Sequence, residues 1–195
     1  MNNQPTAVRR AHATNAAPGA RARRSLRGVA LGLALAGAAG AAGAEPIRHP
    51  LPNGSTFPIA QAVEVPAGMT TVYLSGVTPS PADPKATPNS PAFWGDTRTQ
   101  ATAVFTRMKA TLEGLGLGFG DVVSMTVYLV GDPALGGRMD FTGFMAAYSA
   151  HFGTAEQPRL PSRSTVQVAG LVAPGMLVEV EVTAVRPVAA AATSP

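Results

Sequence analysis

The stretch from Pro161 to Val185 reads PSRSTVQVAGLVAPGMLVEVEVTAV, and the expected fold follows from it. Two runs of alternating, β-favouring residues flank a central Pro-Gly pair, which is typical of a turn, so the stretch predicts a β-hairpin. One strand begins near Arg163, and the other carries Glu179 and Glu181 between valines. An Arg and a Glu on adjacent strands could bind a small carboxylate and transfer a proton beside it.

Three further strands are predicted upstream of this stretch. Residues 60–65 and 70–77 alternate well enough to form strands, and the run at 122–130 is rich in β-favouring residues. In this last strand the apolar side chains should share one face, and they are Val123, Met125, Val127 and Leu129.

Two helices are predicted between the strands. The first begins with an N-cap at Thr97, where Gln100 would complete a capping box, and it ends at Gly114. The second covers 141–152, where aromatic and Met residues recur at helical spacing. The order β-β-α-β-α-β-β predicts an α+β fold, a mixed sheet with both helices on one face. Self-association would bury the other face.

The charge of the chain is unevenly distributed along its 195 residues, although the formal net charge is +4. Six arginines and no acidic residue precede Glu45. The remainder has nine Lys and Arg (15 − 6) against eleven Asp and Glu, a balance of −2. The basic character belongs to the N-terminal region, so we expect no nucleic-acid-binding surface on the domain.

Residues 1–44 have the parts of an export signal. A basic region with Arg23-Arg24 precedes a short apolar run, and Ala42-Gly43-Ala44 forms a small-x-small cleavage site. We therefore expect the protein to be located outside the cytoplasm, either periplasmic or secreted. The twin-arginine export route is possible, and we expect no membrane span after cleavage. The mature chain would comprise a Pro-rich segment at 45–57, one domain at 58–187 and a disordered tail at 188–195.

Several motifs resemble those of the RidA-like (YjgF-type) reactive-intermediate deaminases. Ser162-Arg163-Ser164, followed by the Val-Glu-Val-Glu-Val run, is similar to the C-terminal signature of that family. Tyr73-Leu74-Ser75-Gly76 is similar to its strand ending in Ser-Gly, and 120–129 to its central strand. The segment 140–152 is similar to its second helix. The resemblance covers roughly residues 57–186.

The resemblance implies a chorismate-mutase-like fold that forms a homotrimer with sites between subunits. It implies hydrolysis of small enamines or imines of the 2-imino acid type to a keto acid and ammonia, with no cofactor and no metal. The partner would be a small substrate that bears a carboxylate. His49 and His151 make no metal-ligand pair in the sequence.

The resemblance also assigns roles to individual residues. Arg163 would bind the substrate carboxylate, and Glu179 would position or activate the attacking water. Backbone near Ser75, Gly76 and Thr165 would line the pocket. A structural ion pair at a subunit contact is the alternative for Arg163, and a solvated polar face is the alternative for Glu179.

Two substrate-binding positions depart from the family pattern. Ile59 stands where the deaminases usually have Tyr, and Met145 where they usually have Asn. A second interpretation is therefore a non-catalytic trimer that binds a small carboxylate. A third is an interaction module whose contact is the Pro-rich loop at 78–95, where Phe93 and Trp94 would serve as lid, subunit anchor or plain packing residues.

Overall fold

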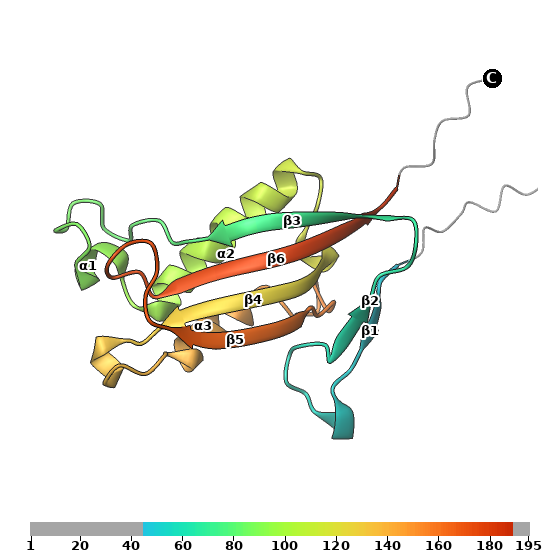
Figure 1. Ribbon diagram of the computed structural model, residues 1–195, viewed down its shortest axis with the longest axis horizontal. Helices are drawn as coiled ribbons and strands as arrows, with labels where there is room; N and C mark the ends of the chain where they lie inside the picture. Colours follow the sequence, from blue (N-terminus) through green and yellow to red (C-terminus); the bar gives the residue numbers. More distant parts are fainter. Residues whose placement is uncertain (1–44, 189–195) are drawn as a thin grey trace, which may run out of the picture. The chain divides into compact units, whose positions relative to one another are not determined.

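The computed structural model describes residues 45–188 (Figure 1). The predicted export signal lies outside the described residues, and so does the predicted tail apart from Val188, whose backbone N–H donates to the carbonyl of Gly68 at 3.1 Å. Among the described residues, no helix combines the length and the apolar character that crossing a membrane would require.

A four-stranded mixed sheet forms the centre of the domain, as predicted for an α+β fold (Figure 1). The strands lie in the order β3-β6-β4-β5; β4 and β5 are parallel, and the other pairs are antiparallel. Two helices, α2 (Thr97–Gly114) and α3 (Phe141–Tyr148), pack on one face. The strands are β3 (Met69–Val77), β4 (Val122–Val130), β5 (Ser162–Val168) and β6 (Val178–Pro187).

The predicted hairpin at 161–185 is wrong, because β5 and β6 both pair with β4 and not with each other. Alternation identified both strands correctly, but it carries no information about which edge each one joins. The connection between them crosses the end of β4 and contains Gly175 at a φ of 82°. That connection is held by Gln100, which donates to the carbonyl of Gly175 at 3.0 Å and accepts from the N–H of Leu177 at 2.7 Å.

The start of α2 differs from the predicted capping box. Asp96 is the N-cap, and its carboxylate accepts from the N–H of Thr99 at 2.8 Å. This bond lowers the pKa of Asp96. Thr97 is already helical, and the buried Gln100 turns inward to the crossing connection instead of completing a box.

The predicted strand at 60–65 is present as a shorter strand, but it belongs to an N-terminal arm and not to the main sheet. β1 (Ile47–His49) and β2 (Ala62–Glu64) form a separate two-stranded antiparallel sheet, and Ala60 alone bridges to Ser162 in the main sheet. We call residues 45–65 the arm. Arg48 fastens it to the domain, since its guanidinium donates to the backbone carbonyls of Leu160 (3.0 Å), Gly120 (2.9 Å) and Val122 (3.2 Å).

The core lies between the two helices and the inner faces of β4 and β6. The predicted apolar face of β4 is confirmed as buried. The second helix ends at Tyr148, earlier than predicted, yet Phe152 still packs on the Tyr148 ring with centroids 4.7 Å apart. Shorter elements are α1 (Pro91–Trp94) and the 3-10 turns Pro52–Gly54, Phe119–Asp121 and Pro133–Leu135.

The loop at 78–95 packs against its own chain. Trp94 is buried, and its ring N–H donates to the carbonyl of Pro174 at 2.9 Å. Phe93 meets the Trp94 ring edge-on with centroids 4.7 Å apart. The packing interpretation of Trp94 is therefore confirmed.

Gln100→Ala should destabilise the domain by about 3 kcal/mol, because it leaves a buried N–H and two carbonyls without their partner. Urea denaturation measures the change. Thr102→Ala, on the exposed side of the same helix, is the control and should change stability by less than about 0.5 kcal/mol. Equal effects of the two substitutions would contradict the role of Gln100.

Candidate functional site

Arg163 lies in a cage of aromatic rings. Its register with Met125 on β4 directs its side chain to the helix-covered face of the sheet, at the β5 edge beside α3. Three of the rings come from one face of α3, and the fourth comes from the arm. The guanidinium carbon lies at these distances from the ring centroids: Tyr148 4.2 Å, Phe144 5.4 Å, Phe57 5.5 Å and Phe141 5.9 Å.

The guanidinium has no carboxylate partner within residues 45–188. Nη2 donates to the sulfur of Met145 at 3.2 Å, whereas Nη1 is buried without a hydrogen-bond partner. Burial lowers the pKa of Arg163, and Tyr148 opposes this effect. Aromatic faces attract the cation but leave its N–H groups unsatisfied, so the arrangement suits an anion that accepts from Nη1.

A cleft of about 290 Å³ borders Arg163. Ile59 lines this cleft, and Met145 contacts the guanidinium from α3. Thr165 follows two residues later on the same face of β5, and its hydroxyl is also buried without a partner. We call Ile59, Met145, Arg163 and Thr165 the arginine half-site.

Glu179 lies against the backbone of Gly76. Pairing between β3 and β6 shifts from Leu74↔Val182 to Val77↔Val180, which is a β-bulge at Ser75-Gly76. A Cβ at Gly76 would lie 2.0 Å from Oε1 of Glu179, so only glycine allows this approach. We call Ser75, Gly76 and Glu179 the glutamate half-site.

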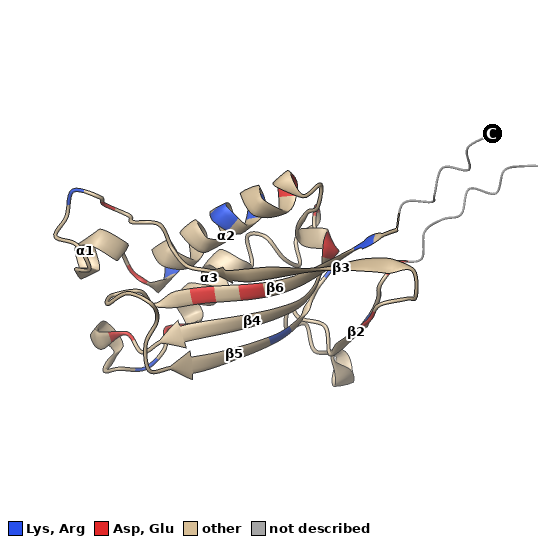
Figure 2. Cartoon of the chain, turned by 45° about the horizontal axis from the view of Figure 1, so that its top comes forward, with Lys and Arg blue, Asp and Glu red and all other residues tan. Residues whose placement is uncertain are grey.

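The two half-sites do not meet within one chain. Arg163 pairs with Met125 and Glu179 with Tyr128, and these β4 residues are three apart, so the two side chains point to opposite faces. β4 also separates their strands by about 10 Å. Figure 2 shows the acidic positions of β6 and the basic position of β5 on either side of β4. The prediction of an Arg and a Glu on adjacent strands is thus wrong for the single chain.

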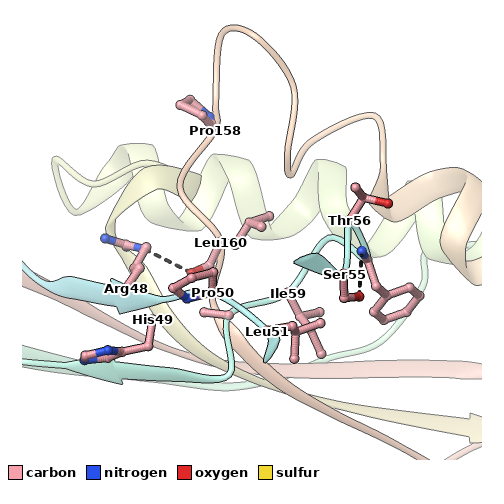
Figure 3. A pocket seen from close by; sticks show the side chains of 11 residues that line it. Arg48, His49, Pro50, Leu51, Ser55, Thr56, Ile59, Pro158 and Leu160 are labelled. Carbon is pink, nitrogen blue, oxygen red and sulfur yellow. Dashed lines mark hydrogen bonds between the residues drawn. The ribbon is translucent and has the colours of Figure 1, made fainter. Parts of the chain in front are cut away.

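A second cavity, of about 220 Å³, lies between the arm and the domain (Figure 3). Sequence reasoning missed it, because the segment at 45–57 gave only the expectation of an extended chain. Arg48, which follows Pro46 and Ile47, was the available signal, since a cation that becomes buried needs partners from the domain. The apolar lining consists of Pro50, Leu51, Phe57, Ile59, Ala60, Pro158 and Leu160.

The histidines of the described chain have other surroundings. His49 lies 2.6 Å from Glu64 on the exposed arm. His151 packs against Phe105 and Phe119, and burial lowers its pKa. Within residues 45–188, no three His, Asp or Glu side chains are grouped so that they could hold a metal ion.

Comparisons with known proteins agree on one family. The family model described as Endoribonuclease L-PSP matches residues 55–186. Protein DfrA of Myxococcus xanthus is 38% identical over 128 residues, which are 66% of this chain and 85% of that protein. The structure of YyfB from Yersinia pestis, of the Rid protein family, has the same fold, with a TM-score of 0.53 at 22% identity over 70% of this chain and 96% of that one. E. coli TdcF with bound serine is 30% identical over 71% of this chain and 94% of that one, with a TM-score of 0.46.

Tyr148 should make stability depend on pH in the alkaline range. Its hydroxyl donates to the carbonyl of Pro58 at 2.8 Å, and burial raises its pKa to about 12. The stabilisation from the neutral phenol is complete below pH 10, where the unfolded phenol begins to ionise, and is lost as the pH rises to 12. This loss should be about 2–3 kcal/mol of the free energy of unfolding.

Urea denaturation between pH 9 and 12 measures this loss. Tyr148→Phe should remove it from the pH profile, and Tyr73→Phe, which leaves the buried phenol in place, should retain it. An unchanged profile in Tyr148→Phe would contradict the prediction.

Proposed function

This chain belongs to the Endoribonuclease L-PSP family, the family of the YjgF and RidA proteins, and from that premise we propose that it hydrolyses 2-imino acids and their enamine tautomers to a 2-keto acid and ammonia. One observation carries the proposal. Arg163 has a buried N–H that nothing in the described chain satisfies, and a cleft large enough for a small acid borders this residue.

Arg163 binds the substrate carboxylate. A guanidinium packed over the Tyr148 ring is restrained in its rotamer, so little entropy is lost when the anion binds. Each charge-assisted hydrogen bond contributes about 1.5–3 kcal/mol. The backbone at Thr165 borders the same carboxylate.

Glu179 acts on water beside Gly76. The imine reacts in its protonated form, C=NH2+. The Glu179 carboxylate accepts a proton as the water oxygen forms a bond to the imine carbon, and the C=N electron pair moves to nitrogen, which becomes a neutral amine. Glu179 then returns the proton to the nitrogen of the tetrahedral carbinolamine. The C–N bond breaks, ammonia leaves, and the carbinol hydroxyl loses a proton to give the keto acid.

The working site needs two copies of the chain, arranged as a homotrimer with sites between subunits. The opposite faces of Arg163 and Glu179 support this arrangement, because the two half-sites can complement each other only from different chains. The sheet face that the helices leave uncovered offers a surface for the contact: Tyr73 on that face is 81% exposed.

A non-catalytic trimer that binds a small carboxylate is the second candidate. Met145 favours this non-catalytic candidate. Its sulfur accepts the hydrogen bond from Nη2 of Arg163, and its side chain has no polar hydrogen to donate to a substrate. Ile59 likewise adds an apolar wall to the cleft.

We also propose that the protein is exported and acts in the periplasm or outside the cell. The support is the sequence between Arg23 and Ala44 alone, with its basic, apolar and small-x-small parts.

Arg163→Met should lower kcat/KM for imine hydrolysis by roughly 10- to 100-fold, because the charge-assisted bond from Nη1 is lost. Glu179→Gln should lower kcat by a similar factor while carboxylate binding persists. The measurement is the decay of a freshly generated imine.

Glu181→Gln is the matched control for Glu179. Glu181 lies on the same face of β6 but accepts from the Tyr128 hydroxyl at 3.0 Å, so its loss should leave the rate unchanged. Equal rates for wild type and Arg163→Met would refute the proposal. Arg163-dependent binding of pyruvate without turnover of any imine would select the non-catalytic candidate.

A further inference from the structure

The cavity between the arm and the domain, here the arm cavity, has one part of its wall outside the family match. That match begins at residue 55, whereas the cavity wall includes Arg48, His49, Pro50 and Leu51. The three backbone bonds of Arg48 fix this wall against the domain. Arg48 and the three residues after it thus add a wall that the family match does not cover.

The arm cavity shares part of its wall with the cleft that borders Arg163. Leu51, Ile59 and Ala60 line both the cavity and the cleft that borders Arg163. Phe57 provides a second connection, because it lines the cavity while its ring centroid lies 5.5 Å from the guanidinium carbon. A molecule held by Arg163 thus has the cavity directly beside it.

The lining of the cavity selects for apolar groups. Both of its titratable side chains are engaged elsewhere: Arg48 donates to backbone carbonyls, and His49 pairs with Glu64. The remaining polar side chains at its border are Ser55, which accepts from the N–H of Phe57, and Thr56 (Figure 3). Proline, leucine, isoleucine and phenylalanine supply the rest of the wall.

We propose that the arm cavity binds the side chain of the substrate and makes the protein selective for 2-imino acids with branched aliphatic or aromatic side chains. This inference rests on the proposed function. In a 2-imino acid the side chain begins two bonds from the carboxylate, so a carboxylate on Arg163 directs it across Phe57 and Ile59. A volume of about 220 Å³ accommodates an isobutyl or benzyl group.

The test compares imines derived from L-alanine, L-leucine and L-phenylalanine, generated in place by an amino acid oxidase with catalase present. Wild type should show kcat/KM at least about tenfold higher for the two larger imines than for the alanine imine. Thr56→Trp, which fills the cavity without contacting Arg163, should abolish this preference by raising KM for the larger imines alone. Thr111→Trp, on the exposed side of α2, is the matched control and should keep it.

The outcomes separate the inference from the proposed function. If wild type accelerates all three imines equally, or if Thr56→Trp keeps the preference as Thr111→Trp does, the selectivity is refuted and the hydrolase stands. If wild type accelerates no imine, the hydrolase fails and the selectivity fails with it.

Discussion

A largely buried guanidinium that has no carboxylate partner among residues 45–188 is the constraint on which the rest of this structure depends. Arg163 loses hydration on the covered face of the sheet, and four aromatic rings compensate only part of that loss. The rings belong to α3 and to the arm, so the cage ties both elements to β5. The cage gives Nη1 no hydrogen-bond acceptor from the described residues, and an anionic ligand would supply one.

The central position of β4 determines where the rest of the chemistry can occur. Because β5 and β6 flank β4, the carboxylate of Glu179 and the guanidinium of Arg163 are kept on different faces of one chain. This separation explains how a chain can contain both the arginine and the glutamate that the family signature implies and still not bring them together. The proposed trimer resolves it by bringing the arginine half-site of one copy to the glutamate half-site of another.

The sequence was sufficient for the strands and helices of the main sheet layer and for the family, but not for the pairing of strands. Alternation located β4, β5 and β6 because burial on one face imposes a period of two. It could not place β4 between β5 and β6, since that choice depends on Gln100 holding the crossing connection from a helix far away in the chain. The arm was missed for a similar reason. Its docking depends on hydrogen bonds from Arg48 to backbone carbonyls, and the sequence of side chains does not indicate which carbonyls will be available as acceptors.

Subunit complementation tests the two-copy site most directly. Arg163→Met and Glu179→Gln subunits, each inactive alone, would be co-expressed at equal levels and assayed for imine hydrolysis. If each site takes its arginine from one copy and its glutamate from another, roughly a quarter of the sites in random trimers contain both intact residues, and about that share of wild-type activity should return. A mixture no more active than the separate variants would contradict the account.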